Sequence, residues 1–168
     1  MRVVSIDPGL RQCGVAIWDC EHLVWAGLAR NDYSGKNQFI AARSMSYSVW
    51  ALVDKTPQQL VIERPQVIRG WTRNAESITA LSLVVGALLV GGGVGTLAPA
   101  LPQLFEYLPV QQKGNVPKPI MESRARARLS QAELLSVHLP YHNGKLSKSL
   151  AHNVWDAVWL GLQHIGRK

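Results

Sequence analysis

An apolar segment that ends in an acidic residue opens the chain and constrains its fold more than any other feature. Residues 2–6 are rich in β-branched side chains and predict a buried strand, and Asp7 follows them directly. Pro8 and Gly9 then end the strand, because proline cannot donate to a ladder and glycine permits a sharp turn. A carboxylate at this point either caps the turn or, if buried, needs a cation, a hydrogen-bond network or a metal.

Two more acidic residues occupy comparable places. Residues 59–63 form a second apolar strand pattern, which ends at Glu63 just before an arginine and a proline. Asp156 lies in a C-terminal apolar pattern of helical spacing. Taken singly, Glu63 reads as a surface partner of the arginine that follows it, and Asp156 as a solvated helix residue. Together with Asp7 they form a set of hard oxygen ligands that suits Mg²⁺ or Mn²⁺ in phosphodiester cleavage.

The remaining sequence alternates strand and helix patterns and predicts one α/β domain over residues 1–168. Strands are expected at about residues 2–30, where three follow one another, and at 59–63 and 104–108. Helices are expected at about 37–53, 74–90 and 117–129, with a last helix from about Ser147. Ser130, three residues before Glu133, has the spacing of a capping box for one short helix more.

The segment 78–101 contains no charged residue. Its length would permit a transmembrane helix, which needs about 20 apolar residues. The glycines at 91–93 and 95, and Pro99, argue against one continuous span. We therefore predict a buried helix from Asn74 to about Val90, followed by a glycine turn and no membrane insertion. A helix this apolar is long for a monomer of this size to cover.

Composition bears on the partner and the compartment. The formal net charge is +7 and the pI is near 9.8, which favours a polyanionic partner. Cys13 and Cys20 show no metal-binding spacing and are expected to be reduced core thiols of a cytoplasmic protein. The first apolar run is interrupted by Asp7, so we expect no signal peptide there.

Basic residues gather around the predicted site elements. Those expected to touch DNA are Arg64, Arg69, Arg73, Lys113, Lys118, Arg124, Arg128 and Lys148. Arg124 and Arg128 lie four apart on one predicted helix and repel each other unless an anion lies between them. Trp71, in the loop after Glu63, either stacks on a base or covers the core. The alternative for the lysines is an ordinary solvated face.

Nearly the whole chain resembles the RuvC-type Holliday junction resolvases of the RNase H-like superfamily, and among them most the short bacteriophage relatives. The resemblance rests on Ile6-Asp7-Pro8-Gly9 with Gly14, residues 61–65, Phe105-Glu106-Tyr107 with Gln112-Lys113-Gly114 and Pro117-Lys118, and residues 152–157. It implies an RNase H-like fold, with a five-stranded mixed sheet flanked by helices. It also implies a metal-dependent endonuclease that cuts four-way DNA junctions by symmetric paired nicks with 5′-phosphate ends. The helix at 78–90 would form the interface of a homodimer.

The resemblance also implies four metal-binding positions, for two Mg²⁺ or Mn²⁺ ions in each site. Asp7, Glu63 and Asp156 match three of them. The fourth position lies three residues before Asp156, where many relatives carry an aspartate and some a histidine. This chain has Asn153 there, and His152 is the residue before it. Imidazole is a metal ligand or a general base, whereas Asn153 offers only a neutral carbonyl oxygen. We favour His152 as the fourth catalytic group; the preferred metal and the competence of the site are left open.

Two other functions are compatible with these residues. One is a less selective RNase H-like nuclease that acts on flaps, forks or RNA–DNA hybrids. The other is a junction-binding protein with little catalysis, which the asparagine at position 153 favours. Each of the three would act on DNA in the cytoplasm of a bacterium or of a bacteriophage-infected cell.

Overall fold

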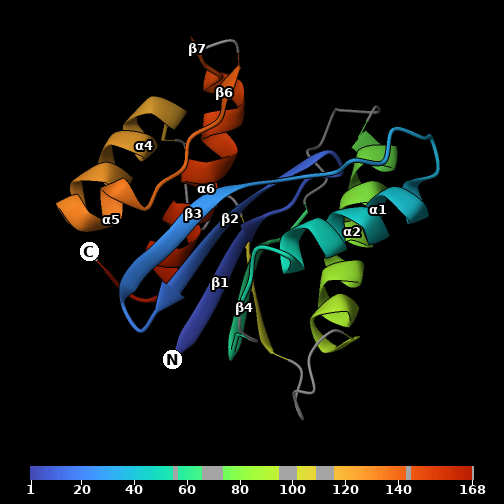
Figure 1. Cartoon of the computed structure of the whole chain (residues 1–168), viewed down its shortest axis with the longest axis horizontal. Helices are drawn as coiled ribbons and strands as arrows, with labels where there is room; N and C mark the ends of the chain where they lie inside the picture. Colours follow the sequence, from blue (N-terminus) through green and yellow to red (C-terminus); the bar gives the residue numbers. More distant parts are fainter. Residues whose placement is uncertain (55–56, 66–73, 95–101, 109–115, 143–144, 168) are drawn as a thin grey trace.

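The computed structural model describes residues 1–54, 57–65, 74–94, 102–108, 116–142 and 145–167 (Figure 1). Five strands form one sheet in the order β3-β2-β1-β4-β5. Their bounds are β1 Arg2–Asp7, β2 Gln12–Asp19, β3 His22–Arg30, β4 Gln59–Glu63 and β5 Gln103–Tyr107. The first three are antiparallel, while β4 is parallel to β1 and β5 to β4. The predicted five-stranded mixed sheet is confirmed.

Helices cover both faces of this sheet, as Figure 1 shows. One face carries α1 (Gln38–Trp50) and α2 (Asn74–Val94). The other carries α4 (Lys118–Ala127), α5 (Gln131–Leu135) and α6 (Lys148–His164). A small hairpin of β6 (Tyr141–His142) and β7 (Lys145–Leu146) leads into α6. The sequence patterns did not predict this hairpin, because its strands are too short to show alternation.

The predicted glycine turn after about Val90 is wrong, because α2 continues through the glycines to Val94. Each glycine inside a helix costs about 1 kcal/mol relative to alanine. Gly91 nevertheless suits its position, since a Cβ there would lie 2.3 Å from the hydroxyl of Ser46 on α1. Trp50 of α1 also donates to the backbone oxygen of Leu88, over 3.0 Å. Close packing of α1 on the backbone of α2 thus outweighs the local preference for a turn.

The short helix α5 begins as its sequence predicts. The Ser130 hydroxyl accepts from the backbone N–H of Glu133, and the Glu133 carboxylate accepts from the backbone N–H of Ser130, which completes the capping box. None of the described helices combines the length and the hydropathy that a bilayer crossing requires.

Candidate active site

Two carboxylates lie side by side where neighbouring parallel strands end. Asp7 is the last residue of β1 and Glu63 the last residue of β4. The preceding residues, Ile6 and Ile62, are register partners, so the two acids follow one another across the sheet. Both side chains are half-buried. The two strand-end acids thus close adjacent strands at one edge of the sheet, while their role as metal ligands stays a prediction.

The same two side chains point to the face that α6 covers. Ser5, two residues before Asp7, donates its hydroxyl to the backbone oxygen of Ala157 on α6, over 2.8 Å. Val61, two residues before Glu63, packs in the hydrophobic cluster that contains the buried residues of α6. Because side chains alternate along a strand, Asp7 and Glu63 share that face.

The third acid, Asp156, is carried over these strand ends by α6. It is only 4% exposed. One turn before it, the backbone oxygen of Asn153 lies against Gly14, which is the partner of Asp7 across β1 and β2. One residue after it, Ala157 lies over β1. Asp156 therefore sits between helix and sheet, close to the level at which β1 ends.

The two candidates for the fourth group lie differently on α6. Asn153 is in line with Ala157, four residues on, and both face the sheet. His152 is about 100° further round the helix, on the side of Asp156. The ring nitrogen Nδ1 of His152 is buried and has no hydrogen-bond partner among the described residues. A buried nitrogen of this kind is available to a ligand or a proton. The choice between the two residues stays a prediction.

The chemistry of these side chains suits a hard divalent cation, since three carboxylates are joined by an amide oxygen and an imidazole. Their arrangement suits it less well. In the described part of the chain, no three histidine, cysteine, aspartate or glutamate side chains are gathered so that they could hold a metal ion. The fold thus brings Asp7, Glu63 and Asp156 to one edge and one face without a finished coordination shell.

Cys13 lies beneath this edge and is a packing residue. Its thiol donates to the backbone oxygen of Gly9 and accepts from the N–H of the same residue. Burial raises the pKa of Cys13 to about 12, against the effect of the Gly9 N–H and together with the negative charge of Asp7. The thiol therefore stays protonated, as predicted for a core cysteine. Cys20 was predicted to be a core thiol as well, and that is wrong, because it is exposed at the end of β2.

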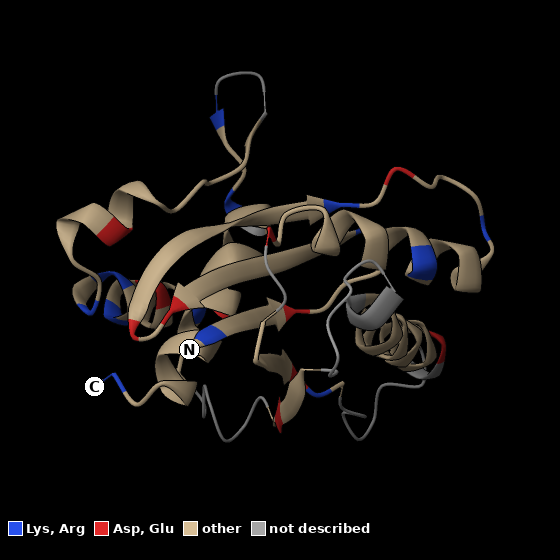
Figure 2. Cartoon of the chain, turned by 60° about the horizontal axis from the view of Figure 1, so that its bottom comes forward, with Lys and Arg blue, Asp and Glu red and all other residues tan. Residues whose placement is uncertain are grey.

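The residues predicted to contact DNA fall into three groups, one of which is Arg128 alone, half-buried at the end of α4. Arg64, Lys118, Arg124 and Lys148 are exposed and lie on or beside β4, α4 and α6. Arg69, Trp71, Arg73 and Lys113 lie outside the described residues. Figure 2 shows basic positions on several separate elements, including α4 and the β6–β7 hairpin. The hairpin also exposes Tyr141, opposite Leu146, which the sequence patterns did not single out.

Arginines of α4 stack on tryptophans of α6. The Arg126 guanidinium lies 4.4 Å from the ring centre of Trp155, and that of Arg128 lies 4.5 Å from the ring centre of Trp159. Cation–π contact of this kind joins the two helices. The side chain of Arg128 is thus held against Trp159, and the predicted anion between Arg124 and Arg128 stays a prediction.

A histidine that the sequence did not signal joins the end of α6 to the sheet. His164, the last residue of α6, has Nε2 2.8 Å from Oε1 of Gln59 and Nδ1 3.0 Å from the hydroxyl of Tyr107. Burial lowers the pKa of His164, which favours the neutral ring. Because an amide oxygen only accepts, Nε2 donates to Gln59 and Nδ1 accepts from Tyr107. The end of α6 is thereby joined to β4 and β5.

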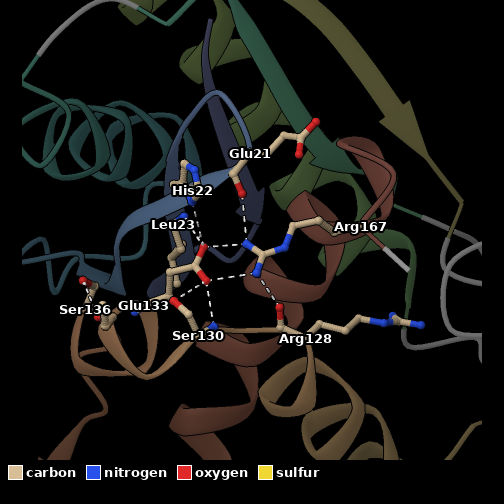
Figure 3. A network of polar contacts seen from close by, with 9 residues as sticks. Glu21, His22, Leu23, Arg128, Ser130, Glu133, Ser136 and Arg167 are labelled. Carbon is tan, nitrogen blue, oxygen red and sulfur yellow. Dashed lines mark hydrogen bonds and ion pairs between the residues drawn. The ribbon is translucent and has the colours of Figure 1, made fainter.

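A second unsignalled network holds the end of the chain (Figure 3). The buried carboxylate of Glu133 accepts from the backbone N–H of Leu23 over 2.9 Å and from the guanidinium of Arg167 over 3.0 Å. Arg167 also donates to the backbone oxygen of Glu21. Burial by itself would raise the pKa of Glu133, but these bonds and those from Ser130 lower it to about 2. The network ties α5 and the C-terminal residues to the β2–β3 turn.

The sheet order, the two parallel strands after an antiparallel meander and the final helix over the carboxylates define the RNase H-like class of fold. No protein-family model and no curated protein sequence matches the chain. Among solved structures, Thermus thermophilus RuvC in complex with a Holliday junction substrate has a TM-score of 0.64 and 18% identity, covering 98% of this chain and 92% of that one.

A second Thermus thermophilus RuvC structure has a TM-score of 0.63 and 16% identity, with 99% and 98% of the two chains covered. The yeast mitochondrial Holliday junction resolvase Ydc2 has a TM-score of 0.57 and 9% identity, with 97% of this chain and 77% of that chain covered. The chain therefore has the fold of RuvC, and the predicted resemblance is confirmed at that level. The resemblance to short bacteriophage relatives stays a prediction.

Proposed function

We propose that this chain is a metal-dependent endonuclease that resolves four-way DNA junctions. The proposal rests on one observation above all. Asp7 and Glu63 end adjacent parallel strands of an RuvC-like sheet, and α6 carries the buried Asp156 over the same face. Stability alone does not favour acids at these three positions, because like charges on one face repel and a buried carboxylate is costly. The RuvC that shares the fold was solved with a Holliday junction substrate.

In this proposal Asp7, Glu63 and Asp156 hold the cations, and His152 or Asn153 completes the set. Two Mg²⁺ or Mn²⁺ ions, when bound, would supply a water of lowered pKa and charge stabilisation for the leaving 3′ oxygen. The helix over the strand ends keeps Asp156 away from bulk water, so a cation bound beside it would be less screened than at an exposed carboxylate. The orphaned Nδ1 of His152 offers a place for the proton of the attacking water.

The DNA would lie across the exposed basic residues near this edge. Those are Arg64 beside Glu63, Lys118 and Arg124 on α4, and Lys148 at the start of α6. Tyr141 of the hairpin is 64% exposed and offers an aromatic ring for a base to stack on. Arg69, Trp71, Arg73, Lys113 and Arg128 complete the proposed DNA contacts.

A homodimer is part of the proposal. The helix α2 buries Ala80, Val84 and Leu88 in the core, yet Val90 on the same helix is 67% exposed. After Glu76 in its first turn the helix carries no charge, and an apolar helix that exposes a large side chain such as Val90 to solvent is typical of a protein interface. Two copies related by a two-fold axis would present two sites to two symmetric strands of a junction.

A cleavage assay tests the proposal. A synthetic four-way junction, labelled on each strand in turn, is incubated with the protein in Mg²⁺ or Mn²⁺, beside flap, fork, RNA–DNA hybrid and linear substrates. We expect paired symmetric nicks in the junction, with 5′-phosphate ends that a ligase reseals. Equal cutting of flaps, forks or hybrids would instead identify a less selective nuclease of the same fold.

A second candidate function is junction binding with little catalysis. It is favoured by the asparagine at position 153 and by the lack of a finished metal cluster in the described part of the chain. Tight binding of the junction without cleavage in either metal would select it. Both functions place the protein with DNA, in the cytoplasm of a bacterium or of a bacteriophage-infected cell.

A further inference from the structure

Two close approaches at glycines fix helix α6 on the sheet, one on each side of Asp156. At the first, a Cβ on Gly14 of β2 would lie 1.8 Å from the backbone oxygen of Asn153. At the second, a Cβ on Gly161 of α6 would lie 2.2 Å from Nε1 of Trp18. Real Cβ atoms do not approach this closely, so the glycines allow helix and sheet to touch. Asp156 is held between these two points.

A buried hydroxyl adds a directional bond between them. Nε1 of Trp18 donates to Oγ of Ser5 over 3.0 Å, and Oγ of Ser5 donates to the backbone oxygen of Ala157 over 2.8 Å. An indole nitrogen can only donate, so Ser5 must accept from Trp18 and turn its own proton to a carbonyl. Ala157 provides the nearer one, since the oxygen of Ala16 is 3.5 Å away. Ser5 and Trp18 are both fully buried.

This bond joins the immediate neighbourhoods of two site carboxylates. Ser5 lies two residues before Asp7 on the same face of β1, and Ala157 directly follows Asp156 on α6. We propose that Ser5 is a positioning residue that holds Asp156 in place opposite Asp7. The inference rests on the proposed function, because it assigns a role to Ser5 in the geometry of that site.

Packing alone does not account for the hydroxyl. The surrounding cluster consists of apolar residues such as Val3, Ala16 and Val154. A polar group buried there is unfavourable unless its hydrogen bonds are made, and Ser5 makes two, since it also accepts from Nε1 of Trp18. What a hydroxyl adds is a fixed direction and distance to one carbonyl of α6. Displacement of a supporting group by about 1 Å can lower a rate about a hundredfold.

The chain offers a matched control on the other face of the sheet. Oγ of Ser46 on α1 donates to the backbone oxygen of Ala87 on α2, over the same 2.8 Å, and Ser46 is 3% exposed. It is thus also a buried serine bonded to a helix carbonyl, but it lies away from the carboxylates. Loss of this bond should weaken the fold and leave the site unaltered, although Ser46 lacks the additional bond that Ser5 accepts from Trp18.

The test compares Ser5→Ala with Ser46→Ala by four measurements: thermal unfolding, amide hydrogen exchange of α6, Mn²⁺ binding without DNA, and single-turnover junction cleavage. Both variants should lose thermal stability, and Ser5→Ala should lose more, because Nε1 of Trp18 then has no acceptor. Only Ser5→Ala should raise the half-saturating Mn²⁺ concentration and lower the cleavage rate, each by about tenfold, as for other residues that orient metal ligands. Junction affinity without metal should not change. Ser5→Thr, which keeps the hydroxyl, should restore the parental metal requirement.

The outcomes separate this inference from the proposed function. Equal Mn²⁺ binding and equal cleavage in Ser5→Ala and Ser46→Ala would overturn the role of Ser5 while the nuclease stands. A parental protein that neither binds Mn²⁺ nor cuts any branched DNA would overturn the proposed function. In that case amide hydrogen exchange at residues 153–160 tests the role of Ser5 separately. Exchange in Ser5→Ala equal to that of the parent would remove the positioning role too. Faster exchange in Ser5→Ala but not in Ser46→Ala would support it. If Ser5→Ala does not fold, Ser5→Cys carries the same comparison with a weak donor of similar size.

Discussion

The backbone oxygen of Asn153 lies directly against Gly14, so closely that no side chain fits between α6 and β2 at this point. Gly14 is also the cross-strand partner of Asp7. One glycine therefore decides how near the helix that carries Asp156 comes to the strand that carries Asp7. The distance between Asp7 and Asp156 thus depends on Gly14, which has no side chain that could take part in the reaction.

Gly14→Ala should consequently damage both fold and site. The new methyl group cannot be accommodated without a shift of α6, since its neighbours are backbone atoms. We expect the free energy of unfolding to fall by about 1 to 3 kcal/mol, the usual cost of overpacking, and cleavage to be lost first. Urea denaturation and the junction assay measure the two effects. Parental stability together with parental cleavage would contradict this contact.

Removal of single carboxylate charges tests the site itself. Asp7→Asn, Glu63→Gln and Asp156→Asn should each abolish cleavage and leave junction affinity intact or higher, because a negative charge beside phosphate is lost. Glu106→Gln is the control: Glu106 is exposed on β5 and is the register partner of Ile62, which faces away from α6. A site variant that retains more than about a tenth of the parental rate would remove that residue from the catalytic set.

The fourth ligand is decided by a pair of substitutions. If His152 binds the cation or takes the proton, His152→Ala should be nearly inactive, and Mn²⁺ should support the parent at least as well as Mg²⁺, since imidazole prefers the softer ion. If Asn153 is the ligand, Asn153→Asp should raise activity in Mg²⁺ and His152→Ala should be mild. Full activity of His152→Ala would overturn our preference for the histidine. An inactive parent that Asn153→Asp rescues would be a disabled form of the enzyme.

The structure identifies an exposed residue of α2 at which the predicted dimer interface can be tested. Val85 of α2 is buried and Val90 is exposed. Val90→Asp should therefore give a folded monomer that binds the junction poorly. Val85→Asp should lower the free energy of unfolding by several kcal/mol, because it places an unpaired charge in the core. Sedimentation at micromolar concentration separates the two results. A parental protein that sediments as a monomer under these conditions would contradict the two-site scheme.

Acid should loosen the C-terminal network at Glu133. The pKa of this carboxyl is lowered from its ordinary 4.5 to about 2, so its contribution is complete above about pH 4.5 and is lost as the pH falls towards 2. Glu133→Gln should lower stability at pH 7 by roughly 3 kcal/mol and flatten the acid limb of the unfolding curve. The control is Glu122→Gln, whose ion pair with Arg126 is partly exposed, with an expected loss below about 1 kcal/mol. Parallel acid limbs in parent and Glu133→Gln would contradict the assignment.

Local features of the chain were readable from sequence because they depend on near neighbours. The β-branched run before Asp7, the second run before Glu63 and the capping box at Ser130 each involve a few consecutive residues. Their backbone preferences hold in any context that lets a strand or a helix form. The α/β class, the strand-end position of two acids and the basic charge follow from such patterns.

Contacts between distant segments decided the rest. Only the parallel pairing of β1 with β4 puts Asp7 beside Glu63, and only the close approach of Gly14 to Asn153 brings α6, and with it Asp156, to the same edge. Packing of α1 against Gly91 likewise stabilises α2 as a helix as far as Val94, although the glycines there locally favour a turn. Such contacts join residues far apart in the sequence, and they depend on which surfaces pack together in the folded chain. They cannot be inferred from a short window of neighbouring residues. The sequence by itself thus determined which chemical groups the protein carries and on what elements, while the tertiary structure decided which of them stand together.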